Sequence, residues 1–468
     1  MDLSTLDLST LDLSQWQTGE LGDYTEFRAQ QNTDRLLAML NGDLNENYSE
    51  TKKGLSCRVY QQGVWGFAAG ADIGQNHSQS LAKMAQRNAH FLASRQTKNK
   101  GGLIVNPFSL QNSFASLQAK AEVGDRIRMM EQVDRYIQEH CPKVTARSLH
   151  LMELDMEKAL LLANGNQGYS FTPRTHLVFS ITAENSQGQP VVIRDSIGGL
   201  GQYEDQSYGV DRFQPIIDLA YKHLLDKTKA VAPKGGKHTV VMDSRLAGIL
   251  AHEAIGHTTE ADLVLGGSVA GDLMGQQVAS ELVSLVDFAH SYQGETLPVP
   301  VMIDDEGVQA NDTTIIEKGV LKSFLHNRES AKHFGVDPTG NARAFLYSDE
   351  PLIRMRNTAF LPGQDRLEDM IASIDNGYYL CRTSNGQADS TSEFMFGIPM
   401  GYEIKDGKLG RAITDTSISG VAFDVLKAVD MVSEEMTWWG YGMCGKKQPI
   451  PVGMGGPAIK AKLHVGGQ

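Results

Sequence analysis

Residues 252–257, His-Glu-Ala-Ile-Gly-His, constrain the local fold more than any other stretch of this chain. Two imidazoles and a carboxylate so close together are the set that a zinc hydrolase uses, neutral nitrogen ligands and an adjacent base. In the common arrangement the second His follows the first by four residues, on the same helical face. Here His257 follows His252 by five. A regular helix would leave the two rings about 140° apart, so they can share one ion only if the helix is distorted.

A π-type distortion would resolve this His-Glu-x-x-x-His spacing. It brings the two rings to within about 50° of each other, and such distortions favour functional sites. Gly256 is a residue at which the backbone could yield. Upstream, residues 237–242 have the pattern of a short strand, and Asp243 and Ser244 are candidate helix N-caps. The sequence therefore predicts a strand followed by a distorted, metal-bearing helix; the alternative is a polar helix end with two hydrogen-bonded histidines.

A catalytic zinc usually takes three protein ligands and keeps one open position, so a further ligand is needed. Glu260 and Asp262 are the near candidates. Cys444 is the distant one, in a glycine-rich loop beside two lysines that favour its thiolate. An isolated cysteine is most often an inert apolar group, so the residue pattern leaves the choice open. Glu253 follows the first ligand directly, which suits a general base; the alternative is an ordinary helix-surface carboxylate.

Length and composition exclude several classes of protein. At 468 residues the chain is expected to form two or three domains. Its net charge of −13 argues against a nucleic-acid-binding surface. The chain has no stretch of 18 apolar residues, so no transmembrane helix is predicted. The N-terminus lacks the features of a secretory signal. The four cysteines are widely spaced and form no Cys-x-x-Cys pair, which fits reduced thiols and a cytoplasmic location.

The chain is expected to be an α+β protein with a β-rich C-terminal part. Residues 1–20 begin with a five-residue repeat (Asp-Leu-Ser-Thr-Leu) and are predicted to be a disordered tail. Residues 21–232 are predicted to form an α+β region, with 21–115 and 116–232 as candidate subdomains. Residues 233–468 are predicted to form a domain with a curved or barrel-like sheet that carries the metal-binding helix.

Within the N-terminal region, apolar spacing predicts helices and strands in turn. Helices are expected over about 25–41, 78–94, 122–140 and 210–228. Paired strands are expected over 54–69, and a period-two pattern over about 143–198 predicts further strands. Beyond the metal helix, strands are expected in the runs 298–304, 308–325, 353–362, 378–383, 392–406 and 460–465.

Several motifs in order make this chain resemble the TldD/PmbA family of metallopeptidases, closest to its TldD-like, metal-bearing branch. The resemblance covers most of the chain, from about residue 25 to the end. Its strongest part is residues 252–262. The other matching segments are 304–307, 317–321, 339–341, 354–358, 444–446, 451–457 and 465–467.

The resemblance implies a zinc-dependent peptidase with His252, His257 and Cys444 as ligands and Glu253 as catalytic acid and base. It also implies cleavage of unfolded or small peptides, bound by strand addition to a sheet edge. It further implies a homodimer, or a heterodimer with a PmbA-like paralogue. Residues 444–449 lack the Gly-Gln pair common in the family after the lysine, so we expect a shortened loop that keeps the ligand. The competing hypotheses are a non-catalytic scaffold subunit of such a heterodimer and a zinc hydrolase of small amides.

Overall fold

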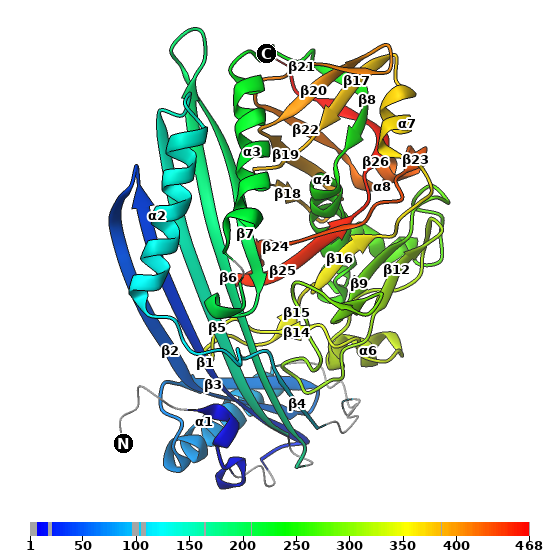
Figure 1. The fold of residues 1–468 in the computed structure, drawn as a ribbon. Coiled ribbons are helices and arrows are strands. Elements are labelled where there is room, and N and C mark those ends of the chain that lie inside the picture. Colours follow the sequence, from blue (N-terminus) through cyan, green and yellow to red (C-terminus); the bar gives the residue numbers. More distant parts are fainter. Residues whose placement is uncertain are drawn as a thin grey trace.

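The computed structural model describes residues 7–16, 21–95, 103, 109–162, 165–206, 208–384 and 386–467. Figure 1 shows an α+β fold in which a sheet of long strands, on the left, faces a C-terminal half built from shorter strands. The large sheets of the described residues are open and mixed, and none closes into a barrel. The prediction of an α+β chain with curved sheets in a β-rich C-terminal half is confirmed.

The N-terminal sheet has seven strands in the order β3-β2-β1-β5-β6, with β4 and β7 both paired to β6. All neighbours are antiparallel except β4 and β6. The strands are β1 (Tyr24–Leu40), β2 (Asp43–Gln61), β3 (Val64–Gly70), β4 (Leu110–Ser113), β5 (Ala146–Leu162), β6 (Gln167–Glu184) and β7 (Pro190–Leu200). Strands from both candidate subdomains therefore belong to one sheet.

Three long helices cover this sheet, as the apolar spacing predicts. They are α1 (Gln75–Ala93), α2 (Val123–His140) and α3 (Val210–Lys227). Apolar side chains of α2 and α3 pack on β5, β6 and β7, whereas α1 packs on β2 and β3. The opposite face of the sheet is polar and meets the C-terminal half. On that face Gln30 and Asn32 donate to Phe345 O at 2.5 and 2.6 Å, and Lys158 pairs with Asp305 at 2.6 Å.

The predicted helix over 25–41 is wrong, because these residues form strand β1. The middle of the segment, residues 30–35, is wholly polar and has no apolar stripe for a helix. The decisive signal is Asn41-Gly42, whose positive φ angles of 51° and 93° form the tight turn into β2. An Asn-Gly pair between two strands is the usual connection of a two-residue β-hairpin.

The predicted disorder of residues 1–20 is wrong for residues 7–16; residues 1–6 and 17–20 lie outside the described part. Leu8, Leu13 and Trp16 are buried against the core beneath α1. Asp7 and Asp12 each cap a short 3-10 turn, Leu8–Thr10 and Leu13–Gln15. Each of the two described units, which begin at Asp7 and Asp12, thus has one Asp cap and one buried Leu, and this apolar burial orders residues 7–16.

The C-terminal half contains a six-stranded and a nine-stranded sheet. The six-stranded order is β13-β12-β9-β16-β25-β24. The nine-stranded order is β18-β19-β22-β26-β8-β17-β20-β21, with β23 also paired to β26. The strands are β8 (Gly236–Met242), β9 (Leu285–Phe288), β12 (Thr313–Glu317), β13 (Val320–Leu321), β16 (Asn357–Phe360), β17 (Asn376–Leu380), β18 (Gly386–Ala388), β19 (Glu393–Ile398), β20 (Gly401–Lys405), β21 (Lys408–Ala412), β22 (Thr416–Val421), β23 (Met431–Val432), β24 (Thr437–Cys444), β25 (Ile450–Gly456) and β26 (Ile459–Val465).

Short elements complete this half. Two small hairpins are β10 (Ser291–Tyr292) with β11 (Glu295–Thr296), and β14 (Ala342–Arg343) with β15 (Leu352–Ile353). The helices are α4 (Ser244–Ile249), α5 (Ala261–Leu265), α6 (Arg328–Phe334), α7 (Leu367–Ala372) and α8 (Ala422–Lys427). Most predicted strand runs contain a strand, but residues 298–304 do not; there only Ile303 forms an isolated bridge, with Gln309.

Candidate metal centre

Strand β8 leads directly into the helix that carries the two histidines. Asp243 caps α4, its side chain accepting from Leu246 N at 2.8 Å. The helix then widens into a π-helix over Leu250–Gly256, which confirms the distortion that the histidine spacing predicts. As a result the rings of His252 and His257 lie edge to face, with centroids 5.1 Å apart and an interplanar angle of 77°.

The side chain of Met355 approaches Gly256 closely at the end of the π-helix. A Cβ at this position would lie 1.9 Å from Met355 Sδ, closer than any real contact. The backbone φ of Gly256 is −54°, an ordinary value, so the constraint is space and not conformation. Met355 therefore packs against the point at which the helix is distorted.

The third candidate ligand atom, a sulfur, comes from a residue near the C-terminal end of the sequence. Cys444 is the last residue of β24, which forms a hairpin with β25. Its Sγ lies 3.2 Å from His257 Nε2, and one ligand atom each from His252, His257 and Cys444 lie within 4.8 Å of one another. Imidazole nitrogens and a thiolate are donors that zinc accepts, and three protein ligands leave one position of a tetrahedral zinc open.

The hydrogen bonding of His252 shows that the donor set fits a metal ion. Its side chain is 1% exposed, and neither ring nitrogen has a hydrogen-bond partner among the described residues. A buried polar group without a partner costs free energy, so such groups are rare. A cation between the two rings and the thiolate would satisfy the nitrogen that faces them.

Glu260 and Asp262, the two nearby candidates for the third ligand, lie beyond the ligand atoms. Glu260 is fully buried, and its Oε2 lies 2.9 Å from His257 Nδ1, the nitrogen opposite the thiol. Lys446 Nζ lies 3.0 Å from that same oxygen and 2.7 Å from Asp262 Oδ2. A carboxylate on the second nitrogen of a ligating histidine fixes its ring orientation and raises its basicity.

The local charges favour an ionised thiol beside a basic imidazole. Burial raises the pKa of Cys444, but its interactions with His252 and His257 outweigh burial and lower the pKa to about 3. Burial lowers the pKa of His257, but the charge of Glu260 and the contact with Cys444 raise it well above its usual range. The thiolate form is the one that binds metals.

Glu253 lies beside the three ligand atoms and is not one of them. Its Oε2 is 3.8 Å from His257 Nε2, and its side chain is 24% exposed, whereas that of His252 is buried. This places a carboxylate at the solvent-accessible side of the cluster. Sequence reasoning thus named four residues that the fold brings together.

Sequence reasoning gave no role to the arginine that holds the cysteine loop. Arg354 is fully buried and donates to three carbonyl oxygens: Cys444 O at 2.7 Å, Gln448 O at 2.8 Å and Lys446 O at 3.0 Å. Its segment, 354–358, stood out only as a motif. The signal available in the sequence is the pair of arginines within an apolar run, because buried arginines need specific partners.

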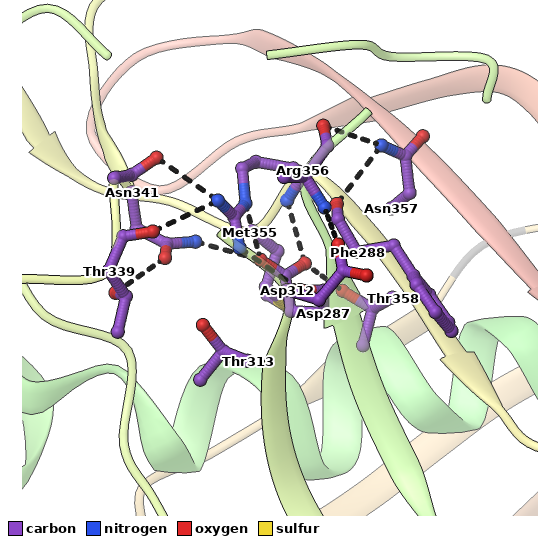
Figure 2. Close-up of polar contacts among 12 residues, drawn as sticks. Asp287, Phe288, Asp312, Thr313, Thr339, Asn341, Met355, Arg356, Asn357 and Thr358 are labelled. Atoms are coloured by element: carbon purple, nitrogen blue, oxygen red, sulfur yellow. Dashed lines mark hydrogen bonds and ion pairs between the residues drawn. The ribbon is translucent and has the colours of Figure 1, made fainter. Parts of the chain in front are cut away.

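The second arginine of that segment organises a separate buried cluster, shown in Figure 2. Arg356 Nε pairs with Asp287 Oδ2 at 2.9 Å, and its backbone N donates to Asp287 Oδ1 at 2.9 Å. Asn341 Nδ2 and Thr358 Oγ1 donate to the same carboxylate at 2.8 and 3.0 Å. We call Asp287, Asn341, Arg356 and Thr358 the Asp287 network.

Two family models match this chain. The model described as the PmbA/TldA metallopeptidase C-terminal domain matches residues 235–467, and the model of PmbA/TldA metallopeptidase domain 1 matches residues 25–91. Together they span well over half of the chain. The chain belongs to the PmbA/TldD metallopeptidase family. The motif-based resemblance is therefore confirmed.

Named relatives of the PmbA/TldD family agree with this assignment over nearly the full length. A metalloprotease of Methanothermobacter thermautotrophicus is 29% identical, covering 95% of this chain and 96% of the relative. A zinc metalloprotease TldD homolog of Saccharolobus solfataricus is also 29% identical, over 89% of this chain and 90% of the relative.

Solved structures of the PmbA/TldD type share the fold. TldE from Thermococcus kodakarensis superposes with a TM-score of 0.72 at 17% identity, covering 96% of this chain and 97% of that one. At this identity the likeness shows the fold alone. No helix among the described residues is long and apolar enough to span a membrane.

Proposed function

We propose that this protein is a zinc-dependent metallopeptidase. The observation that carries the proposal is the convergence of His252, His257 and Cys444. Within the described part of the chain, neither ring nitrogen of His252 has a hydrogen-bond partner. The proposal is supported by the names of the relatives, which are metalloproteases, and of one that is a zinc metalloprotease. The set of two nitrogens and one sulfur suits zinc and leaves a position for water or substrate.

The residues around the site have separate roles in this proposal. When bound, zinc acts as a Lewis acid and lowers the pKa of water to about 7. Glu253 accepts the proton from the attacking water and donates it to the leaving amine. Glu260 holds the ring of His257 so that Nε2 points to the thiolate. Arg354 fixes the backbone of the loop that carries Cys444.

The strand that carries Cys444 supports peptides as the substrate class. Strand β24 ends the six-stranded sheet, and in the described residues its only strand partner is β25. Its free edge offers main-chain groups to an extended peptide, which would pair with weak dependence on sequence. We therefore propose unfolded or small peptides as substrates. We also propose a homodimer or a heterodimer with a PmbA-like paralogue, supported by the shared fold of TldE.

The deciding experiment distinguishes the role of metal binding from the role of Glu253 as the general base. Glu253→Gln removes the proton acceptor but no ligand, so zinc should stay bound at one equivalent. Hydrolysis of an unfolded peptide should fall by about 10²- to 10⁴-fold, the usual contribution of general acid–base catalysis. Glu131→Gln, at an exposed position on α2, is the matched control and should keep full activity.

Two outcomes would replace this proposal. Undiminished turnover by Glu253→Gln would remove Glu253 from the mechanism. A wild-type chain that holds no zinc and cleaves no peptide, even when mixed with a paralogue, would be a non-catalytic scaffold subunit. A preference for small amides over unfolded peptides would instead identify a zinc amide hydrolase.

A further inference from the structure

A small polar cavity lies between the two halves of the molecule, apart from the metal ligands. One wall is the polar face of β5 and β6, and the other is the C-terminal segment 299–305 with Arg343 and Pro451. Its volume is about 60 Å³, which is room for a few waters or a small charged group.

Arg174, on β6, lines this cavity and forms no ion pair with any carboxylate of the described residues. Its side chain is 5% exposed, and its Nε and Nη1 are buried without hydrogen bonds. Other buried arginines of the same sheet reach carboxylates: Arg58 pairs with Glu26 at 2.9 Å, and Arg28 lies 3.8 Å from Asp305. A buried guanidinium without a counter-charge is costly, so the position of Arg174 calls for an anion.

The charged residues that line the cavity are Lys158, Arg174, Arg343, Asp304 and Asp305, so cations outnumber acids by one. Asp304 accepts hydrogen bonds from the backbone N of Glu306, Val308 and Ala342, and burial together with the charge of Glu306 raises its pKa to about 8. Arg343 donates only to carbonyl oxygens, Met355 O at 2.5 Å and Pro451 O at 2.8 Å, and it forms no ion pair within the described residues. Lys158 and Asp305 neutralise each other at 2.6 Å. Burial and the charge of Arg343 lower the pKa of Arg174 to about 9, so that Arg174 stays cationic at neutral pH.

The cavity adjoins the hairpin that carries Cys444. Pro451, which accepts from Arg343, follows Ile450, the cross-strand partner of Cys444. Two residues beyond Arg174 on β6, the ring of His176 lies 5.4 Å from that of Tyr441 on β24. A group held at Arg174 would therefore lie alongside the strand that ends in the metal ligand.

We propose that Arg174 and Arg343 form a binding site for a carboxylate. The planar guanidinium matches a carboxylate in a two-point contact. The cavity has room for a group of this size but not for a much larger one. The carboxylate comes from a peptide, in which case the inference rests on the proposed peptidase function, or from a free small acid. The two sources share the same chemistry at the site.

The first test measures binding without turnover. The full-length protein is melted in sodium acetate and in sodium chloride of equal ionic strength. Acetate at ten times its dissociation constant should raise the melting temperature of the wild type by about 2 °C. Arg174→Met should abolish the rise, whereas Arg174→Lys should keep part of it. Because acetate can also contact a bound metal, only the part that depends on Arg174 counts.

The variants also show whether Arg174 is merely structural. Arg174→Met in chloride should melt at the wild-type temperature or above, because it removes an uncompensated buried charge. Arg128→Met, at an exposed arginine of α2, is the control and should respond to acetate like the wild type. An equal acetate response in wild type and Arg174→Met, no response in either, or a destabilised Arg174→Met in chloride would overturn the proposal.

The second test identifies the source of the carboxylate. Peptides that differ only in a C-terminal carboxylate or carboxamide, and in Glu or Gln at one position, are compared for KM and kcat. If the peptide supplies the carboxylate, its removal should raise KM by about 10- to 100-fold in the wild type but not in Arg174→Met. Equal KM values with a positive acetate test assign the site to a free acid. If no peptide is cleaved, the proposed function fails and the acetate test still decides the site.

Discussion

The Asp287 network and the metal centre are both buried in the C-terminal half, and both depend on residues 354–358, but their hydrogen bonding differs. In the Asp287 network (Figure 2), the carboxylate and the arginine that pairs with it are surrounded by partners. In the metal centre, neither ring nitrogen of His252 makes a hydrogen bond to any described residue. The first cluster is complete as a structural element, whereas the second becomes complete only with a ligand. Removing a residue from each should therefore have opposite consequences.

The largest effect is expected from His252→Leu. This variant loses one of three ligands, so bound zinc and peptide hydrolysis should both fall below detection. Without metal, its melting temperature should equal or exceed that of metal-free wild type, because an unpartnered buried polar group has been replaced by an apolar one. Zinc content by mass spectrometry and melting curves in chelator provide the measurements. A strongly destabilised metal-free variant would show that His252 has a structural partner after all.

Asp287→Ala should show the reverse pattern. It leaves Arg356 buried without its counter-charge, which typically costs about 3–5 kcal/mol. The free energy of unfolding in urea should fall by that amount, with metal affinity affected only through the loss of folded protein. Asp424→Ala, at an exposed position on α8, should change stability by no more than about 0.5 kcal/mol. If Asp287→Ala were as stable as the wild type, the Asp287 network would not have the structural role that distinguishes it from the metal centre.

The two clusters also differ in what the sequence reveals. The spacing of His252 and His257 is enough to predict a π-distortion, because ring positions follow from helix geometry. Cys444 follows only from the family resemblance, because no local pattern links residues so far apart in the chain. The Asp287 network escapes prediction for the same reason. Its members lie on β9, on β16, directly before β16 and directly before β14, and tertiary packing sets the pairing between them.

Secondary structure shows the same limit. The helices α1, α2 and α3 are predictable from their apolar spacing. Strand β1 is not, because the few apolar residues at its ends happen to fit a helical pattern, whereas Asn41-Gly42 is the better signal. The opening repeat looks like a tail because its composition is biased. Two of its leucines, Leu8 and Leu13, are buried under α1, which the sequence alone does not show.

The smallest expected effect concerns Glu260. This residue is fully buried, and its Oε2 contacts both the ligand His257 and Lys446. Glu260→Gln keeps the size of the side chain but removes the charge behind His257. Such changes typically reduce metal affinity by about 10- to 100-fold. Asp262→Asn, which loses only the contact with Lys446, is the control and should have a smaller effect. Titration of metal-free protein with zinc at pH 8 measures both.

The dependence of this effect on pH distinguishes charge from packing. Because Glu260 raises the pKa of His257, the proton competes with zinc at a higher pH in the wild type than in Glu260→Gln. As pH falls, wild-type affinity should therefore start to decline first, and the gap between the two proteins should narrow. The contacts with the two histidines lower the pKa of the Cys444 thiol, which favours its ionised form in this range. A gap that stays constant from pH 8 to pH 5 would mean that Glu260 acts by packing alone, like the residues of the Asp287 network.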